Sequence, residues 1–458
     1  MDKIGLEQIL ASQKSFFASG KTLDVEYRIS NLKKLRSLIL SHEDELSHAL
    51  HKDFNKPYFE VLGTESRYAI AEINMMIREL KKWSGRQRIR TSIVNFPARS
   101  YIQPQPYGQV LIISPWNYPF QLSMIPVMGA LTAGNCVVFK VSQKVPNTLE
   151  VISRIISHFP KGLILFVKGE HSLSDYLLDF PFDKIFFTGS PAVGKKVMIK
   201  AAENLTPVTL ELGGKNPCVV AADAKLTFAA KRIASGKFLN AGQTCIAPDY
   251  LLVDSKVKDR FLELLVNEIK SFYGNDASRS PDYCRMVNIA KTKRMESFLG
   301  EGDIITGGVT DVDNCFMAPT IIDGIRPEDP IMQEEIFGPV LPVIPFNNFS
   351  EVYSIISRNP KSLAAYIFTT SNRLAGEFLS RTQSGSAAVN DTVMQIASPH
   401  LPFGGIGPSG MGRYHGRESF ETFSNMKSVM EKSNLIDLPV RYPPYTPLKE
   451  KILKLLMR

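Results

Sequence analysis

Apolar and polar positions along the chain follow two periods, one typical of helices and one typical of buried strands. From residue 5 to residue 84 the period is helical, because leucine and isoleucine recur at spacings of three, four and seven residues. From residue 108 to residue 220, short apolar runs alternate with helical segments. Short strands separated by helices indicate a parallel sheet covered on both faces. We therefore expect an α/β domain whose sheet is partly covered by the first helices.

The strands and helices of this domain can be predicted by residue range. Strands are expected at 109–113, 136–139, 163–167, 184–187 and 208–212, and helices at 121–133, 147–158, 172–179 and 192–203. Ligands of such sheets bind beyond the carboxyl ends of the strands. Two stretches suited to a nucleotide lie at those ends, residues 140–143 and 188–194. The second opens a helix whose free N–H groups suit a pyrophosphate, although an ordinary strand-to-helix turn uses the same residues.

A second alternating half follows. Helices are expected at 226–239, 257–273 and 290–299, and strands at 250–253, near 321, at 340–344, at 364–368 and from 386. This pattern predicts a second α/β domain that faces the first across a cleft. Residues 334–339 are expected in a loop at that cleft. Residues 403–412 form a glycine-dense loop that we interpret as a shaped wall.

Two further segments differ from this α/β pattern. Residues 86–105 alternate around Pro97 in the manner of a hairpin that extends from the body. In the C-terminal tail, four apolar residues share one helical face and basic residues occupy the others: Leu448, Ile452, Leu455 and Leu456 against Lys449, Lys451, Lys454 and Arg458. Such a short helix buries little area, so we expect it to pack on the protein or to be disordered rather than to touch a membrane surface.

Composition narrows the class of protein. A chain of 458 residues is too long for one core, and its 44% hydrophobic residues suffice for two or three domains. The net charge of +9 arises from 54 basic and 45 acidic residues that are interspersed, which favours solvated surface over nucleic-acid binding. Five separated cysteines without metal spacing argue for a reducing compartment and against zinc. With no apolar run of membrane-spanning length, we expect a cytoplasmic protein.

One cysteine stands where a helical pattern runs into a short glycine-containing loop, Gly236-Lys-Phe-Leu-Asn-Ala-Gly-Gln-Thr-Cys245. Asn240, Ala241 and Gly242 are small enough to end the helix and to let a ligand approach the backbone. A cysteine between a helix end and a strand has its own N–H available to point at whatever the sulfur attacks. Taken alone, a lone intracellular cysteine is more often an inert core residue.

Six motifs, in order along the chain, resemble those of the aldehyde dehydrogenases. They are Pro115-Trp-Asn-Tyr-Pro119, Phe187-Thr-Gly-Ser190, Glu211-Leu-Gly-Gly-Lys-Asn-Pro217, Gly242-Gln-Thr-Cys245, Glu335-Ile-Phe-Gly-Pro339 and Pro402-Phe-Gly-Gly405. The late stretches Ser409-Gly-Met-Gly-Arg-Tyr-His-Gly416, Ser419-Phe-Glu-Thr-Phe423 and Arg441-Tyr-Pro-Pro-Tyr445 are similar to the class 3 branch. So is the apparent lack of the N-terminal extension found in the tetrameric classes.

The resemblance implies a role for each catalytic residue. Cys245 would be the nucleophile, since a thiolate adds to an aldehyde carbon and later leaves from a thioester. Asn117 would donate its amide to the developing oxyanion beside the Cys245 N–H. Glu211 would be the general base that hydrolyses the thioester. Without the family, Glu211 would be an ordinary strand-end carboxylate and Asn117 a turn residue between two prolines.

The resemblance also implies a nicotinamide cofactor. Positions along the adenosine and pyrophosphate match Trp116, Lys140, Gly189, Ser190 and Val193, and positions at the nicotinamide ribose and ring match Glu335 and Phe337. The family's usual Lys-Pro-Ser-Glu reads Lys140-Val-Ser-Gln143 here, so Gln143 replaces the carboxylate expected on the adenosine ribose. The cofactor is therefore expected to be NAD or NADP.

The fold implied is the α/β aldehyde dehydrogenase fold, with a Rossmann-like cofactor domain at 1–85 and 106–209. A second α/β domain at 210–418 would carry the nucleophilic cysteine. A small β oligomerisation flap would comprise 86–105 and 419–445, followed by a tail at 446–458. We expect a homodimer that oxidises an aldehyde to a carboxylate without a metal.

Three other functions are compatible with parts of the sequence. An acylating relative would pass the acyl group to coenzyme A or phosphate, but Glu211 disfavours it because a water-activating base would then serve no purpose. A cofactor-free cysteine hydrolase would need a histidine partner, and the motifs offer only His415. A binding or structural protein of the same fold is disfavoured because Cys245, Asn117 and Glu211 are all present.

Overall fold

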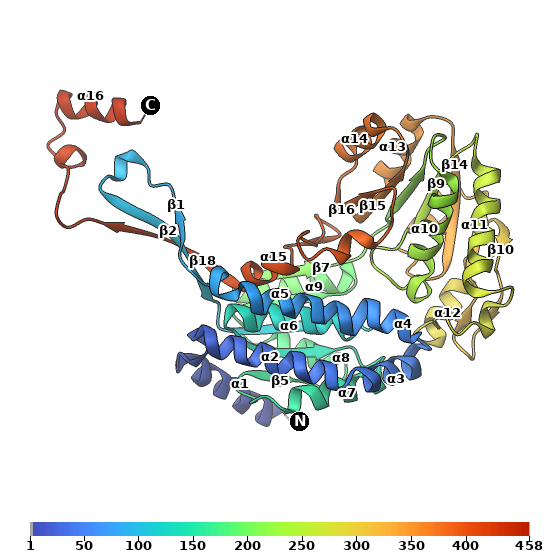
Figure 1. The fold of residues 1–458 in the computed structure, drawn as a ribbon, viewed down its shortest axis with the longest axis horizontal. Helices are drawn as coiled ribbons and strands as arrows, with labels where there is room; N and C mark the ends of the chain where they lie inside the picture. The colour runs from blue at the N-terminus through green and yellow to red at the C-terminus, as the bar shows by residue number, and fades with distance from the viewer. Residues whose placement is uncertain (1–2, 458) are drawn as a thin grey trace.

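The computed structural model describes residues 3–457 as two α/β bodies and a projecting arm (Figure 1). Residues 1, 2 and 458, at the ends of the predicted cofactor domain and tail, lie outside the described residues. Among those described, no helix is long and apolar enough to cross a membrane.

The first body is built on a six-stranded sheet in the order β17-β7-β6-β3-β4-β5. Its strands are β3 (Gln109–Ser114), β4 (Cys136–Val141), β5 (Ile164–Phe166), β6 (Lys184–Thr188), β7 (Val208–Glu211) and β17 (Gly410–Met411). All pairings are parallel except that of β17 with β7. Its helices are α1 (Lys3–Ala18), α2 (Val25–Ser41), α3 (Glu43–Phe54), α4 (Tyr58–Val61), the π-helical turn η2 (Leu62–Ser66), α5 (Arg67–Trp83), α6 (Gln121–Ala133), α7 (Pro146–Ser157), α8 (His171–Leu178), α9 (Pro191–Glu203) and α15 (Gly416–Thr422).

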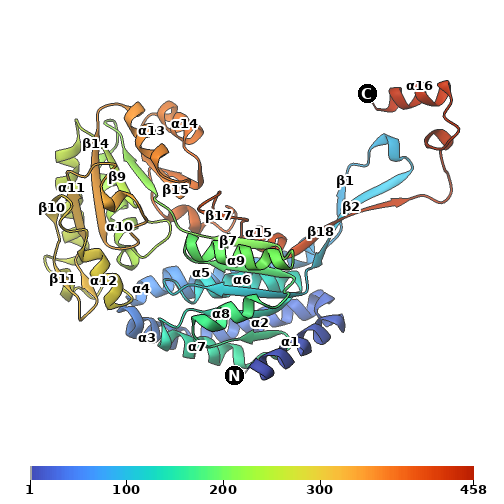
Figure 2. The same ribbon diagram turned by 180° about the vertical axis from the view of Figure 1, so that it is seen from behind.

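Alternate residues of β3 enter two different cores. Val110 and Ile112 pack with α2, α5 and α6 on one face, while Leu111 and Ile113 pack with α1, α8 and α9 on the other. Figures 1 and 2 show the helices of these two layers from opposite sides. The prediction of a parallel sheet covered on both faces, with the early helices among its covers, is confirmed.

Late segments complete this first body. The predicted division after residue 209 falls inside β7, and β17, from the range assigned to the second domain, pairs with β7. The loop at 403–412 is therefore partly a strand, since Gly410 lies opposite Glu211. Phe420 and Phe423, assigned to the flap, are buried in the same core.

The second body has a seven-stranded sheet in the order β10-β13-β14-β9-β8-β15-β16. Its strands are β8 (Pro217–Val220), β9 (Tyr250–Asp254), β10 (Asp303–Thr306), β13 (Thr320–Asp323), β14 (Val340–Phe346), β15 (Ser362–Phe368) and β16 (Ser384–Val389), with a separate ribbon of β11 (Thr310–Asp311) and β12 (Phe316–Met317). Its helices are α10 (Leu226–Phe238), α11 (Lys258–Tyr273), α12 (Ile289–Glu296), α13 (Phe349–Arg358) and α14 (Asn372–Arg381). The predicted second α/β body is thus present.

The arm is an antiparallel sheet of β1 (Gln87–Ile89), β2 (Ala98–Pro106) and β18 (Ser424–Lys432), which confirms the predicted hairpin and adds a third strand. Helix α16 (Pro447–Leu456) lies at its far end (Figure 1). The tail forms a helix whose Lys449 donates to the carbonyls of Tyr442 and Pro444, so its contacts are with the preceding segment of the chain. Its Leu448 and Leu455 stay 67% and 70% exposed.

Candidate active site

Cys245 lies in a tight loop between the two sheets, after α10 and η4 (Leu239–Gly242) and before β9. Asn240 and Ala241 adopt left-handed backbone conformations, with φ of 54° and 52°, and these end the helix as predicted. Gly242 follows with φ of 71°, and a Cβ there would collide with the carbonyl oxygen of Gly338. Only glycine therefore lets the loop at 334–339 pack directly onto the cysteine loop.

The thiol of Cys245 is half-buried beside two carboxyl groups. Burial raises its pKa, and the neighbouring Glu335 and Glu211 raise it further. Hydrogen bonds from the backbone N–H groups of Cys245 and Ile246 act in the opposite direction. The resting sulfur therefore carries its proton at neutral pH, and reaction requires a nearby acceptor for that proton.

Asn117 lies in the turn between β3 and α6 and is 3% exposed. Its Nδ2 donates to the carbonyl oxygen of Gln243 at 3.0 Å. In return, Asn240 Nδ2 donates to the carbonyl oxygen of Asn117 at 2.9 Å, so the turn and the cysteine loop are bonded to each other. An amide nitrogen has two N–H donors, and the second remains for an oxyanion formed near Cys245.

Glu211 ends β7 and is 2% exposed. Neither of its carboxylate oxygens has a hydrogen-bond partner among the described residues. Burial raises its pKa well above the ordinary value, and the charge of Arg413 opposes this. A buried carboxyl without partners is costly unless water or a ligand occupies the space beside it. The oxygens of Glu211 are therefore available to bind a reacting water.

Glu335 lies on the loop that follows η6 (Pro330–Met332) and is seated over the turn after Glu211. The N–H of Gly214 donates to its carboxylate, and a Cβ on Gly213 would occupy the place of that carboxylate. Burial, together with the charge of Asp249, raises the pKa of Glu335 to about 8. A second titratable carboxyl is thus available beside Cys245.

Residues not predicted from the sequence hold this loop in place. Lys215 and Asp249 form a buried ion pair at 2.5 Å. Lys215 also donates to a carbonyl of the loop at 334–339, and Asp249 accepts an N–H from it. Arg294 donates to two further carbonyls of the loop, both at 2.7 Å. Lys215 lies within the motif that begins at Glu211, so the sequence offered a signal for its role in the site. Nothing in the sequence around Arg294 indicated such a role.

Trp116 of the first body and Phe337 of the second form an edge-to-face aromatic pair. Their ring centroids lie 5.6 Å apart with the planes at 82°, and Phe337 has φ of 53°. The ammonium of Lys144 lies 5.6 Å from the Trp116 ring centroid. An aromatic wall beside a cation suits a planar group that carries phosphate.

Lys140 is a buried residue of β4, 5% exposed, because the strand continues to Val141 instead of ending at residue 139. Burial lowers its pKa, and the described residues provide no ion pair for it. Gln143 is exposed just beyond the strand. A buried ammonium without a carboxylate partner fits a ligand that supplies hydroxyl or phosphate oxygens.

Gly189, Ser190 and Val193 lie at the turn from β6 into α9. The N–H of Gly189 donates to the Glu211 carbonyl at 2.9 Å, so it is not among the free donors expected there. Ser190 is the N-cap and forms no capping bond with its side chain, and Val193 belongs to the first turn, whose N–H groups lack intrahelical acceptors. The helix start, the aromatic pair and Lys140 together fit a nicotinamide dinucleotide.

Comparison with known proteins agrees with the resemblance of the sequence motifs to the aldehyde dehydrogenases. Residues 3–429 match the model of the aldehyde dehydrogenase family. The chain is 42% identical over 443 residues to the 4,4'-diaponeurosporen-aldehyde dehydrogenase of Staphylococcus aureus, covering 96% of each chain. It is 39% identical over 442 residues to the dimeric NADP-preferring aldehyde dehydrogenase of Canis lupus familiaris, covering 96% of this chain and 98% of that one. The substrate-bound structure of Staphylococcus aureus AldH superposes with a TM-score of 0.97 at 41% identity over the whole of both chains.

Proposed function

The chain belongs to the aldehyde dehydrogenase family and oxidises aldehydes with a nicotinamide cofactor, and we propose that Cys245 is the nucleophile, Asn117 the oxyanion donor and Glu211 the general base. The observation that carries this assignment is the unpartnered, buried carboxyl of Glu211 beside a thiol whose pKa it raises. A structural carboxylate would be hydrogen-bonded.

The thiol must first lose its proton. Glu335 and Glu211 are the carboxyls beside it, and each can accept that proton when ionised. The thiolate then adds to the aldehyde carbon, and the new alkoxide receives hydrogen bonds from the Asn117 amide and the Cys245 N–H. When bound, the cofactor supplies a hydride acceptor.

The resulting acyl group is held on Cys245 as a thioester. No described residue competes for the carboxylate oxygens of Glu211, so it can bind a water molecule and remove its proton as that water attacks the thioester carbon. This role disfavours the acylating alternative, in which another acceptor would take the acyl group. Among the described side chains, none of the histidines hydrogen-bonds to Cys245, and His415 Nδ1 is instead 2.9 Å from Glu72, which disfavours a cysteine hydrolase.

The cofactor positions proposed are Trp116, Lys140, Gln143, Gly189, Ser190, Val193, Glu335 and Phe337. Gln143 has no charge to repel a 2′-phosphate. Two lysines close to it in the chain, Lys140 at the end of β4 and Lys144 beside Trp116, can attract one. We therefore propose that both NAD and NADP support turnover, in keeping with the NADP preference named for the canine relative.

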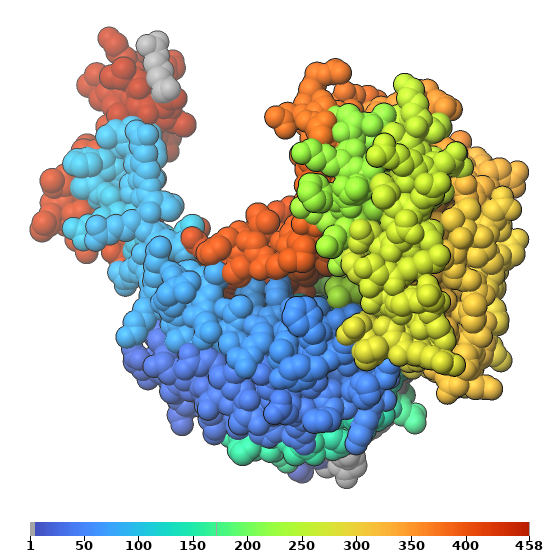
Figure 3. Space-filling view, turned by 45° about the vertical axis from the view of Figure 1, so that its right-hand side comes forward, coloured from blue at the N-terminus to red at the C-terminus, as the bar shows by residue number. Residues whose placement is uncertain are grey.

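A homodimer is proposed from the arm. Apolar side chains of the arm and tail are exposed, among them Ile93 at 59%, Phe96 at 55%, Met430 at 50% and Leu435 at 93%. Figure 3 shows a broad hollow between the arm and the second body. An exposed apolar arm beside a hollow on the same chain suits exchange of arms with a second copy.

The free cysteines suit a reducing cytoplasm as the location of the protein.

The test is a panel of aldehydes read by absorbance of the reduced cofactor, with 4,4'-diaponeurosporen-aldehyde included because the Staphylococcus relative is named for it. Wild type should reduce cofactor and release the carboxylate, while Cys245→Ala should lose at least a hundredfold of the activity and still bind cofactor, because no other nucleophile can replace the thiol. Activity above about a hundredth of wild type in Cys245→Ala would refute the assignment.

A further inference from the structure

A second buried network lies behind the proposed oxyanion site, and the catalytic roles above do not use it. Lys56 follows α3, and Glu65 lies in the π-helical turn η2. Their side chains form an ion pair at 2.9 Å, and both are 0% exposed. Removing two charges from water is costly, so such a pair needs strong compensating contacts. Helical distortions of this kind are frequent at functional sites.

The carboxylate of Glu65 holds the start of α6. Its Oε2 accepts the N–H of Phe120 at 3.1 Å and that of Gln121 at 2.8 Å. An anion at a helix N-terminus is stabilised by the free N–H groups and by the helix dipole. The turn that carries Asn117 lies immediately before the start of α6. The contact with Glu65 therefore sets the distance between that turn and η2.

Lys56 holds the other part of the same turn. Its ammonium lies 4.1 Å from the centroid of the Tyr118 ring. The hydroxyl of Tyr118 is 2.6 Å from Oγ1 of Thr244, the residue before Cys245. The ion pair thus contacts both sides of the oxyanion site, the Asn117 turn directly and the Cys245 loop through Tyr118.

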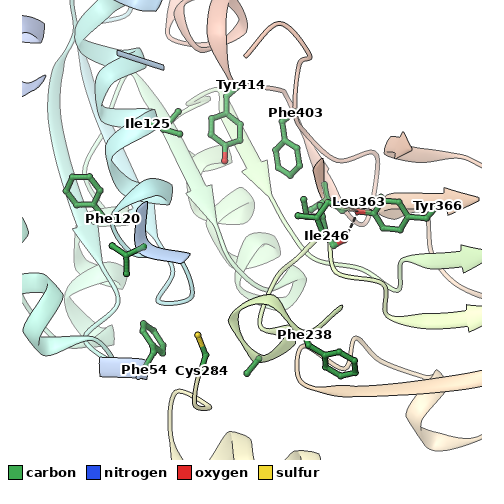
Figure 4. Packing of buried hydrophobic residues seen from close by; sticks show 14 of the residues in the cluster. Phe54, Phe120, Ile125, Phe238, Ile246, Cys284, Leu363, Tyr366, Phe403 and Tyr414 are labelled. Carbon is green, nitrogen blue, oxygen red and sulfur yellow. Dashed lines mark hydrogen bonds between the residues drawn. The ribbon is translucent and has the colours of Figure 1, made fainter. Parts of the chain in front are cut away.

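A third contact extends from the same helical segment. Glu60 of α4 accepts the N–H of Asn240 at 3.2 Å and the thiol of Cys284 at 3.4 Å. Asn240 in turn bonds to Asn117 and to Gln243. Figure 4 shows Cys284 beside Phe54, within a buried cluster that also includes Phe120. Residues 56–65 therefore contact each loop that supplies an oxyanion donor.

We propose that Lys56 and Glu65 are positioning residues for the oxyanion site, which fix the Asn117 amide and the Cys245 N–H relative to each other. The inference rests on the proposed roles of Asn117 and Cys245. Oxyanion donors act only when they are held at hydrogen-bond distance from the developing charge, and a displacement of about 1 Å can lower the rate roughly a hundredfold. Lys56 and Glu65 do not touch the reacting atoms themselves.

The test uses the neutral double variant Lys56→Met/Glu65→Gln, which removes both charges together and so avoids a buried unpaired ion. Gln retains an oxygen that can accept the helix N–H groups. We expect hydride transfer in a single turnover to slow by about 10- to 100-fold. The cofactor dissociation constant and the rate of Cys245 alkylation by iodoacetamide should stay within about threefold of wild type. Alkylation forms no oxyanion, and the carboxyls beside the thiol, Glu335 and Glu211, lie outside this network.

A matched control is Lys258→Met/Asp323→Asn, which removes an ion pair of 2.6 Å in the second body, away from this network. It should leave hydride transfer unchanged. Tyr118→Phe removes only the hydroxyl bonded to Thr244, retains the ring over Lys56, and should slow hydride transfer by about 5- to 20-fold. This variant keeps the proposal testable if the double variant does not fold.

Two outcomes would overturn the proposal. One is hydride transfer within threefold of wild type in the double variant, or in Tyr118→Phe if that variant alone folds. The other is a parallel loss of cofactor affinity and thiol reactivity in a soluble variant, which would indicate a general structural role. If wild type gives no cofactor reduction, or Cys245→Ala retains it, the proposed function itself fails. If wild type reduces cofactor, Cys245→Ala does not, and the double variant transfers hydride at the wild-type rate, then only the positioning role is refuted.

Discussion

Replacing Glu211 with glutamine removes the proposed base with little other change. Glutamine has nearly the same shape, and because neither carboxylate oxygen has a protein partner, no hydrogen bond between described residues is broken. The residue is 2% exposed, so solvent cannot readily take over its role. We therefore expect the loss to fall on thioester hydrolysis, while thiol addition and hydride transfer are affected less.

The magnitude follows from general base catalysis, which contributes about 10²- to 10⁴-fold. This corresponds to about 2.7 to 5.4 kcal/mol in the barrier for hydrolysis. Rapid mixing of Glu211→Gln with aldehyde and cofactor should give a burst of about one reduced cofactor per site, followed by slow turnover. Wild type should show a much faster steady phase.

The pH dependence has a definite sign. Burial raises the pKa of Glu211, so the carboxyl is protonated and inactive as a base until the pH passes that raised value. Hydrolysis in wild type should therefore accelerate with rising pH, and in Glu211→Gln this dependence should disappear. Ionising the buried group also destabilises the fold: its stabilising contribution is complete below the unfolded pKa and is lost as pH rises through the raised folded pKa. The Tm of wild type should accordingly fall more between pH 5 and pH 8 than that of the variant.

Glu335→Gln is the matched control, since Glu335 is the other carboxyl beside the thiol. It should not produce a burst of the same kind. If Glu211→Gln turns over at the wild-type steady rate, water is activated elsewhere, and the reasoning from the unpartnered carboxyl is wrong.

Three further predictions concern the cofactor, the loop and the arm. Gln143→Glu should lower kcat/KM for NADP relative to NAD by about 1–3 kcal/mol, because a carboxylate would repel the 2′-phosphate; an unchanged ratio would show that residue 143 does not contact the ribose. Gly242→Ala should lower stability by about 1–3 kcal/mol in denaturant titration and weaken cofactor binding, because its Cβ would collide with Gly338; a wild-type midpoint would contradict the proposed loop contact. Sedimentation at micromolar concentration should show a dimer, and replacing Phe96 and Met430 with Ser should shift it toward monomer; a monomeric wild type would refute the arm as an interface.

Much of the fold follows from the hydrophobic pattern because its strands are short, apolar and separated by helices. The helix at 121–133 was predicted correctly because it lies between two such strands. The turn at Asn240 was predicted correctly because small residues at this point favour the end of a helix. Strand β17 was not predictable. It has two residues, lies in a glycine-rich stretch without apolar alternation, and exists only because β7 offers an open edge.

The site was predicted less evenly. Cys245, Asn117 and Glu211 were proposed from family motifs and stay predictions. The structure adds that no described residue bonds to the Glu211 carboxylate, which no sequence pattern could reveal. Lys56 and Glu65 were missed because each looks like an ordinary surface charge in a helical stretch. Their complete burial arises from tertiary packing under the Asn117 turn, and tertiary contacts leave no local signal.

The placement of β17 and α15 has a consequence for biosynthesis. The core of the first body includes Tyr414, Phe420 and Phe423, and Asn135 Nδ2 bonds to the Phe423 carbonyl at 2.9 Å. A growing polypeptide therefore cannot complete the core of its first body until residues 410–423 have left the ribosome. Until then the edge of β7 and the apolar surface of α6 remain open to other chains. We expect this enzyme to depend on chaperones during synthesis more than a protein whose halves close independently, and to lose solubility abruptly when truncated before residue 410.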